Sequence, residues 1–508
     1  MALTLMPFLL RTTIIYVIGS EYLGLSSLFS SILQVLSLSE LGFSNAVVYS
    51  MYEPIAANDR KTLCAILNYF RRIYLVIGVI IIGAGLAVMP FLPKLIRNGY
   101  PADINLYYLY ILFLINTALS YLLFAYRGAL LGAYQRTDIT SKVNTVVNVA
   151  CYGLQILGLF LTKNYYVYVY LLILCNVAIN FWTCHCAKRL FPDITPTGRL
   201  SREMKQTIFT RVKGLMLGKI CGTSRNAFDS IFISAFVGLT ANAIYNNYFY
   251  ILNAVTGIMG IIEPAILGGV GNSIVLESQK KNYRDLTRIN FLYMWIGGWF
   301  AICLLCLYQP FTELAWTKDM LLPFSAAALF TLYFYILKMG DVRHVYVQAC
   351  GIWWENRYRA IAEALANLVL NYVLGKMFGL YGILAATLIS LFVINFLWGS
   401  TIIFKYYFTE IRCSKYYKTH ALYAMVTCLG GAACLGLSSM IGGPLIVRFI
   451  AAGVICMIVP HVIYILVYHR TGIYRESMEW LFGIIHIPGE KFVRKIMLIP
   501  CGKEQAYE

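Results

Sequence analysis

The sequence predicts an all-α, polytopic membrane protein with about fourteen transmembrane helices, arranged as two pseudo-symmetric six-helix bundles plus two C-terminal helices. Three observations lead to this prediction. Long apolar runs recur along most of the chain, basic residues gather on alternate loops, and segments of the first half resemble segments of the second half. A water-soluble fold is excluded, because no soluble core could enclose so many apolar helices.

The composition is that of a membrane protein. Of the 508 residues, 60% are hydrophobic and only 13% are charged, whereas soluble proteins carry about 25% charged residues. Apolar runs of roughly twenty residues recur to about residue 468, and a helix of that length crosses a ~30 Å hydrocarbon core. The predicted helices are 2–20, 26–50, 74–92, 104–126, 144–161, 165–187, 214–236, 240–263, 289–308, 322–342, 361–375, 381–404, 420–440 and 445–468.

The net charge of +18 is distributed unevenly between the two sides of the predicted membrane. If both termini are cytoplasmic, 31 of the 41 Lys and Arg lie in cytoplasmic loops and the tail, 5 lie on the opposite side and 5 lie within helices. This asymmetry follows the positive-inside rule. The basic charge therefore indicates topology and contact with anionic lipid headgroups, not nucleic-acid binding.

An internal repeat divides the chain. Three pairs of similar segments occur in the same order, 214 to 219 residues apart, with Gly24 aligned to Gly238 in the first: 22–29 with 236–243, 132–137 with 351–356, and 179–182 with 394–398. Because each copy has six helices, both copies enter the membrane from the same side, and two such lobes fit transport by alternating access. The predicted domains are an N-terminal lobe 1–187, a basic cytoplasmic linker 188–213, a C-terminal lobe 214–404, two additional helices 405–468 and a cytoplasmic tail 469–508.

Charged residues inside the predicted helices are the candidate functional residues, because they are costly in a membrane. Arg225 and Asp229 lie on one helix face at i and i+4, so a local ion pair is one interpretation. The other is that Arg11, Lys219 and Arg225 line a central cavity and bind an anionic headgroup, for which arginine suits bidentate phosphate contacts. The predicted substrate-binding residues are Arg11, Lys219, Arg225, Asp229, Asn45 and Asn247.

Two glutamates are predicted to act in coupling or gating, Glu40 and Glu263. For Glu40 the alternative is a buried carboxyl group that is paired with a neighbouring helix or protonated. Several other polar residues fall near the predicted cytoplasmic ends of helices, where side chains are expected to snorkel to the membrane surface. These residues are Arg127, Lys338, Asp341, Arg343 and His344.

No metal, cofactor or catalytic residue is expected. Cys303 and Cys306 form a CxxC inside an apolar helix, where packing is the interpretation, and Cys184-His185-Cys186 does not complete a four-ligand site. A membrane glycan polymerase or ligase would need a large extracytoplasmic loop with catalytic groups, and the longest such loops here hold about a dozen residues. In the tail, residues 480–485 with flanking basic residues predict an interfacial amphipathic segment, with a disordered tail as the alternative.

The stretch from Arg11 to Tyr74 resembles the polysaccharide-biosynthesis flippases (Wzx type) of the MATE-like, or MOP, superfamily. The residues that carry the resemblance are Glu21-Tyr-Leu-Gly-Leu-Ser-Ser27, Leu36-Ser-Leu-Ser-Glu-Leu-Gly-Phe43 and the loop Tyr52-Glu-Pro54 to Asn58-Asp-Arg60. The likeness covers nearly the whole chain and includes the fourteen-helix count. Arg11 matches an arginine position in the first helix of that family, whose members usually have more residues before it.

The resemblance implies a multi-pass protein of a bacterial plasma membrane that flips undecaprenyl-pyrophosphate-linked oligosaccharide from the cytoplasmic to the outer leaflet. It implies no covalent chemistry. The expected partners are the lipid-linked glycan, membrane lipids and an Na⁺ or H⁺ coupling ion, with no nucleic acid and a monomeric state. Two alternatives stay open: a MATE-type ion-coupled antiporter of small cations or drugs, and a lipid II flippase.

Overall fold

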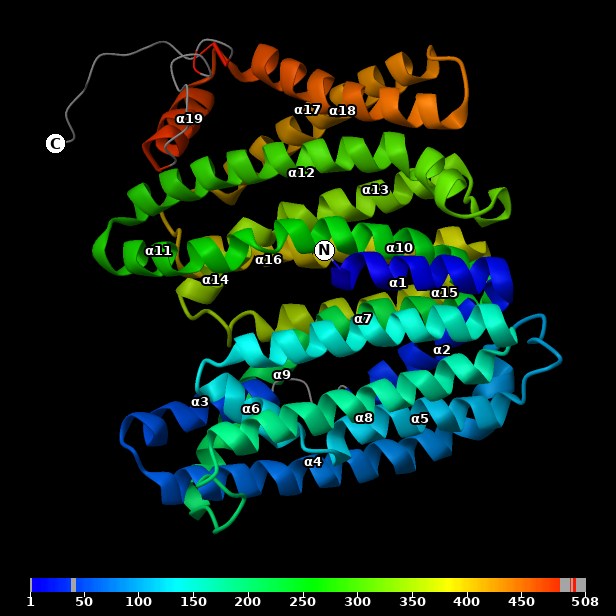
Figure 1. Cartoon of the computed structure of the whole chain (residues 1–508). Helices are drawn as coiled ribbons and strands as arrows, with labels where there is room; N and C mark the ends of the chain where they lie inside the picture. Colours follow the sequence, from blue (N-terminus) through cyan, green and yellow to red (C-terminus); the bar gives the residue numbers. More distant parts are fainter. Residues whose placement is uncertain (1, 38–42, 485–493, 495–496, 499–508) are drawn as a thin grey trace. The chain divides into compact units, whose positions relative to one another are not determined.

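The computed structural model describes residues 2–37, 43–484, 494 and 497–498, and every regular element in this part of the chain is a helix (Figure 1). The first half contains α1 Ala2–Val17, α2 Ser20–Leu36, α3 Phe43–Ala56, α4 Arg60–Val88, α5 Leu106–Leu122, α6 Ala125–Ala133, α7 Thr137–Thr162, α8 Tyr165–Leu190 and α9 Arg202–Phe236. The second half contains α10 Leu239–Met259, α11 Ile262–Leu276, α12 Gln279–Ala315, α13 Phe324–Met339, α14 Asp341–Ala349, α15 Arg357–Ile389, α16 Gly399–Tyr406, α17 Cys413–Ser439, α18 Leu445–Tyr468 and α19 Gly472–Ile484. Met89–Leu95 and Lys318–Met320 are 3₁₀ helices, and Ser390–Trp398 is a π-helix. The predicted all-α class is confirmed.

Eight helical segments of the described chain are long and apolar enough to cross a membrane, or up to nine if the bent pair α5 and α6 is one span. The number is lower than the fourteen predicted helices partly because one segment, Arg357–Tyr406, is 50 residues long and contains two of them. In addition, α1, α2 and α13 have only 16 or 17 residues. The apolar length is nevertheless that of a polytopic membrane protein, as predicted.

The chain forms two compact units, which interleave in sequence. Unit 1 comprises Met1–Asn247 and Ala360–Ala386, and unit 2 comprises Tyr248–Arg359 and Thr387–Glu508. Helices α10 and α15 therefore contribute residues to both units. The predicted division into lobes 1–187 and 214–404, with the linker and tail, stays a prediction.

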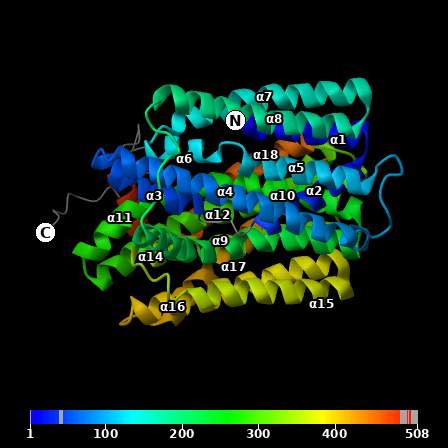
Figure 2. The ribbon, with the colours of Figure 1, turned by 90° about the horizontal axis from the view of Figure 1, so that it is seen from below.

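In unit 1, α7 packs on α8 and α1, α4 packs on α5, and α2 packs on α9 (Figures 1 and 2). Lipid gives little hydrophobic drive for helices to associate, so small residues that permit close approach become important. Gly24 of α2 is such a residue, because a Cβ atom there would collide with the backbone carbonyl of Leu239. Asn242 Nδ2 donates a hydrogen bond to the Gly24 carbonyl oxygen over 3.0 Å and fixes this approach.

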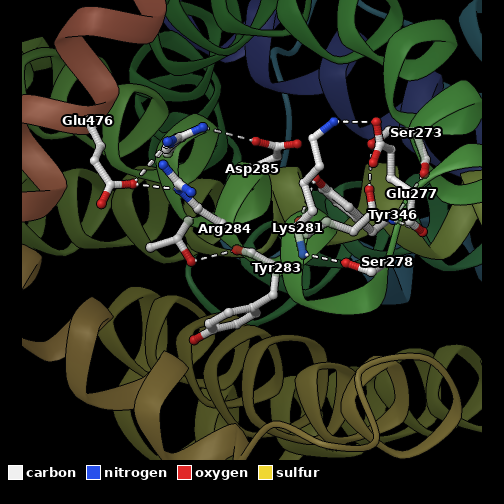
Figure 3. A network of polar contacts seen from close by, with 12 residues as sticks. Ser273, Glu277, Ser278, Lys281, Tyr283, Arg284, Asp285, Tyr346 and Glu476 are labelled. Carbon is white, nitrogen blue, oxygen red and sulfur yellow. Dashed lines mark hydrogen bonds and ion pairs between the residues drawn. The ribbon is translucent and has the colours of Figure 1, made fainter. Parts of the chain in front are cut away.

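Unit 2 is built around α12, a 37-residue helix that packs against α13, α17, α18 and α19. Half-buried Trp295 of this helix has its indole Nε1 3.0 Å from Nδ1 of His461. The first turns of α12 carry a polar network (Figure 3), in which Arg284 and Arg288 donate to Glu476 of α19 over 2.9 and 3.0 Å. Residues 480–484 of the predicted amphipathic segment are thus the end of a helix that packs on α12 and buries Phe482, and residue 485 lies outside the described residues.

The helix boundaries repeat with an offset of 219 residues. At this offset, the last residue of α1 corresponds to the last residue of α9. The first residues of α2, α3 and α4 correspond in the same way to the first residues of α10, α11 and α12. The N-cap residues of α2 and α10 follow the same offset, since Gly19 and Gly238 both have left-handed φ angles, of 114° and 130°. The predicted pairing of Gly24 with Gly238 is therefore wrong by five residues. Apolar similarity could not fix the register, whereas the glycine conformation does.

Each half also contains a broken helix in the same place. Helices α5 and α6 meet at an angle of 45°, and α13 and α14 are separated by Gly340 alone. Just after each break lies a buried arginine: Arg127 donates to the carbonyl oxygen of Ile194 over 2.8 Å, and Arg343 donates to Asn395 over 3.3 Å. Arg127, Arg343 and Lys338 are each only 4% exposed, so the prediction that they snorkel to the surface is wrong. Polar groups of the protein, and not water, are the hydrogen-bond partners of these three side chains.

Candidate functional site

A buried ion pair joins two helices of unit 1. Arg225 Nη1, on α9, lies 2.8 Å from Glu363 Oε1, on α15, and both side chains are buried. Removing two charges from water is costly, and the cost is offset only when the charges are paired in good geometry. This ion pair links segments 138 residues apart, so helix spacing within α9 could not have indicated it.

Asp229, one turn further along α9, is held by neutral donors. The hydroxyl of Tyr245 donates to Oδ2 over 2.9 Å, and the amide Nδ2 of Asn371 donates to Oδ1 over 2.6 Å. The same Nδ2 atom lies 3.2 Å from Oδ1 of Asn367. Asp229 is 1% exposed. A buried carboxylate among amide oxygens and hydroxyls provides the oxygen ligands that hard cations and protons prefer.

The α15 residues of this cluster were missed by the sequence analysis, although a signal was present. Glu363, Asn367 and Asn371 follow each other at intervals of four residues, which places them on one face of a helix. A polar stripe in an apolar helix indicates a buried polar surface. Tyr245 had no comparable signal, because tyrosine is common throughout this chain.

Arg11 lies on α1 and is half-buried. Its Nε atom donates to Oδ1 of Asn247 over 2.6 Å, which brings together two predicted substrate-binding residues 236 positions apart. The partner in this contact is a neutral amide. The contact therefore positions the guanidinium group relative to α10.

Three predicted residues cannot be placed with the others. Glu40 lies outside the described residues. Asn45 and Lys219 belong to α3 and α9, but their side chains are not among those described. The described structure thus brings together Arg11 with Asn247, and Arg225 and Asp229 with α15, within unit 1.

Glu263, the other predicted coupling residue, belongs to a separate cluster in unit 2. It lies on α11, and its carboxyl group is close to that of Asp341 at the start of α14. Asp341 Oδ2 also lies 2.6 Å from Lys338 Nζ and 2.6 Å from the hydroxyl of Tyr293. Two carboxyl groups and one ammonium group therefore lie together at the break between α13 and α14.

Among the described residues, no group of three or more His, Cys, Asp and Glu side chains is arranged to hold a metal ion. Cys303 and Cys306 are free thiols, and Cys184 and Cys186 are also free. Cys151 of α7 and Cys175 of α8 form a disulfide that the sequence analysis did not predict. The 24-residue separation of these two cysteines, in two apolar helices, gives no framework spacing from which to predict it.

Comparison with known proteins adds the fold relationship. No protein-family model matches the chain, and no curated protein matches its sequence. Among solved structures, the lipid II flippase MurJ in an inward closed conformation matches with a TM-score of 0.67, covering 92% of this chain and 97% of MurJ at 13% identity. An inward-facing multidrug resistance MATE family transporter of the MOP superfamily matches with a TM-score of 0.62, covering 81% of this chain and 95% of that protein at 16% identity.

The chain shares the fold of these two structures. A MOP superfamily transporter from Pyrococcus furiosus, described as having a binding pocket of reversed polarity, also matches, with a TM-score of 0.51 at 16% identity; 79% of this chain and 92% of that one are covered. At these identities the likeness concerns the fold alone. The charge of the candidate site is therefore set by this chain's own residues, which are the clusters described above.

Proposed function

We propose that this protein is a membrane transporter that flips a pyrophosphate-linked lipid oligosaccharide, such as an undecaprenyl-linked unit, from the cytoplasmic to the outer leaflet of a bacterial membrane. The MOP fold supports the transport mechanism, since MurJ and MATE transporters share it. The choice of an anionic glycolipid rests on one observation. Arg11, a cation on the apolar helix α1, is positioned by a 2.6 Å hydrogen bond to the Asn247 side chain of α10, and a guanidinium group suits phosphate oxygens.

The pyrophosphate is the group that these arginines would recognise. A guanidinium group matches two phosphate oxygens with two parallel N–H donors, and this match is stronger away from bulk water. Arg225 would contribute only part of its charge, because it is paired with Glu363. Lys219, on the same helix, is proposed as a third cation.

Asp229 is proposed to bind the coupling ion, Na⁺ or H⁺, instead of the substrate. Its carboxylate contacts Tyr245 and Asn371, which are neutral and can rotate to present oxygen atoms to a cation. A cation at Asp229 would favour the opposite orientation of the Asn371 amide, in which its oxygen and not its nitrogen faces the ion. Glu263 is the proposed proton-linked gate of unit 2, and Glu40 stays a candidate for the same role.

A MATE-type antiporter of small organic cations is the second candidate. The observation that favours it is the presence of two buried carboxyl groups, Asp229 and Glu363, on neighbouring faces of α9 and α15. Carboxylates would attract a cationic substrate, whereas a lipid pyrophosphate needs free positive charge. The two candidates therefore differ in which charge is essential, Arg11 or the carboxylates.

The deciding experiment is a surface-glycan assay in a strain that lacks its own glycan flippase, at matched expression. Wild type, Arg11→Gln and Arg225→Gln are compared with Arg448→Gln, a control that removes an exposed arginine from α18. We expect wild type and the control to restore surface glycan and Arg11→Gln to lose it. Restoration by Arg11→Gln, or efflux of small cations without any glycan restoration by wild type, would reject the proposal.

A further inference from the structure

A hollow lies on the polar end of unit 1, away from the residues discussed above. Its volume is about 530 Å³, and it is formed by the start of α4 and by the connection from α8 to α9. Three cations line it, Arg60, Lys61 and Arg199, together with one carboxylate, Asp193. The remaining polar groups are hydroxyls of Thr62, Thr195, Thr197 and Ser201.

The walls of this hollow are fixed by specific contacts. Asn68 of α4 donates to the carbonyl oxygen of Gly198 over 2.8 Å, and buried Arg127 donates to the carbonyl oxygen of Ile194 over 2.8 Å. Gly198 has a φ of +85°, and a Cβ atom added to it would contact Ala65 of α4. The connection is therefore held against α4 at Gly198 and against α6 at Ile194, which gives the hollow a defined shape.

A second hollow of about 260 Å³ adjoins the first and shares Ala65, Gly198, Arg199 and Leu200 with it. It adds two further cations, Arg72 and Lys205, and no carboxylate. The Lys205 ammonium group lies 5.9 Å from the ring centre of Tyr69, which holds it toward the hollow. The two hollows together are lined by five cations and one carboxylate, and that carboxylate is paired with Arg60 over 3.0 Å.

The two hollows lie at the end of a membrane-spanning helix. Their α4 residues begin the segment Arg60–Leu95, one of the apolar spans, so the hollows lie where this helix leaves the hydrocarbon region. The sequence predicts that both segments lie on the cytoplasmic side, where anionic lipids attract clustered Lys and Arg. A phosphate group carries the charge and the acceptor oxygens that two arginines and several hydroxyls recognise.

We propose that these joined hollows form a binding site for a phosphate group, either on an anionic phospholipid headgroup or on a soluble phosphate compound. Lys61 and Arg199 make the main contacts, because Arg60 is already paired with Asp193. Thr62 and Ser201 supply additional hydroxyl donors. The site does not depend on the transport proposed above, since it shares none of the residues assigned there.

The test measures binding to purified full-length protein in neutral detergent. The probes are short-chain phosphatidylglycerol, short-chain phosphatidylcholine as the zwitterionic comparison, and sodium pyrophosphate. The double variant Lys61→Gln/Arg199→Gln is compared with Lys142→Gln/Arg189→Gln, which removes the same two charges from exposed positions outside the hollows. Melting temperatures of all three proteins establish that each is folded.

We expect wild type and the control to bind an anionic probe, and the Lys61/Arg199 variant to bind it at least about tenfold more weakly. Binding of phosphatidylglycerol but not pyrophosphate would identify a lipid headgroup site, and binding of pyrophosphate would identify a site for a soluble phosphate. Equal losses in both double variants would overturn the proposal, because they would show diffuse charge attraction. Absence of anionic-probe binding to wild type would overturn it as well.

Discussion

The two units bury charged side chains in different ways. In unit 1, Arg225 and Glu363 are 138 residues apart in sequence, and Asp229 is held by donors from α10 and α15. In unit 2, Lys338 and Asp341 are three residues apart, on either side of the break between α13 and α14. The buried pair of unit 1 thus joins distant helices, whereas the buried pair of unit 2 is local to a helix break.

The difference indicates where each unit can tolerate change. A long-range buried pair must be intact for two helices to pack, since either charge alone would be left uncompensated in a medium of low polarity. A local pair beside a second carboxyl group has a replacement partner within reach, in this case Glu263. Unit 2 is therefore the better candidate for a cluster that changes its protonation during a transport cycle.

The largest effect is expected from breaking the unit 1 pair. Glu363→Gln leaves the buried guanidinium of Arg225 without this carboxylate, and we expect a loss of about 3 kcal/mol in the free energy of unfolding. The loss is measured by thermal or denaturant unfolding in detergent. In the double variant Arg225→Met/Glu363→Leu, which removes both charges, we expect most of the stability to return. An equal loss in the single and double variants would contradict the pairing.

The next largest loss of stability is expected where two helices approach closely. Gly24→Ala places a methyl group against the Leu239 backbone of unit 1, which cannot move aside, so we expect a loss of about 2 kcal/mol. Gly399→Ala in unit 2 meets the guanidinium end of Arg343, a flexible side chain, and should cost less than half as much. Gly153→Ala, with open space around it, serves as the control. Comparable losses at Gly24 and Gly399 would remove this distinction between the units.

The local cluster of unit 2 should respond more mildly. Asp341→Asn removes one partner of Lys338, but the carboxyl group of Glu263 is close enough to replace it, so we expect a loss of about 1 kcal/mol. The double variant Glu263→Gln/Asp341→Asn should lose clearly more than the sum of its single variants. Strict additivity in a double-mutant cycle would show that Glu263 does not compensate.

The smallest effect concerns the contact between α19 and α12, shown in Figure 3. Burial alone would raise the pKa of Glu476, but Arg284 and Arg288 outweigh it and hold the pKa below its usual value of 4.5. Because the folded-state pKa is lowered, the stabilisation is present above the usual glutamate pKa and is lost as the pH falls through the lowered value.

The Glu476 side chain is 43% exposed, so we expect Glu476→Gln to cost less than about 1 kcal/mol at neutral pH and nothing at strongly acidic pH. Proteolysis of α19 as a function of pH measures the docking of this helix. Lys280→Gln, which alters the exposed pair of Lys280 with Glu410, is the control. A cost that persists unchanged in acid would show that the carboxylate is not responsible.

The sequence by itself determined the membrane character, the helical class and the existence of a repeat. Apolar length decides whether a segment can cross a bilayer, and length is a local property of the chain. The repeat register was not accessible in the same way, since Gly24 and Gly19 are equivalent candidates by composition. The helix boundaries and the left-handed conformation at Gly19 and Gly238 identified the matching positions.

Tertiary structure alone decided the partners of the buried charges. The sequence singled out Arg11, Arg225, Asp229 and Asn247, because a charged or polar residue is conspicuous in an apolar helix. It could not indicate that Arg225 meets Glu363, or that Arg11 meets Asn247 across 236 residues. Helical periodicity specifies which residues share a face, but the identity of the facing helix depends on how the whole unit packs.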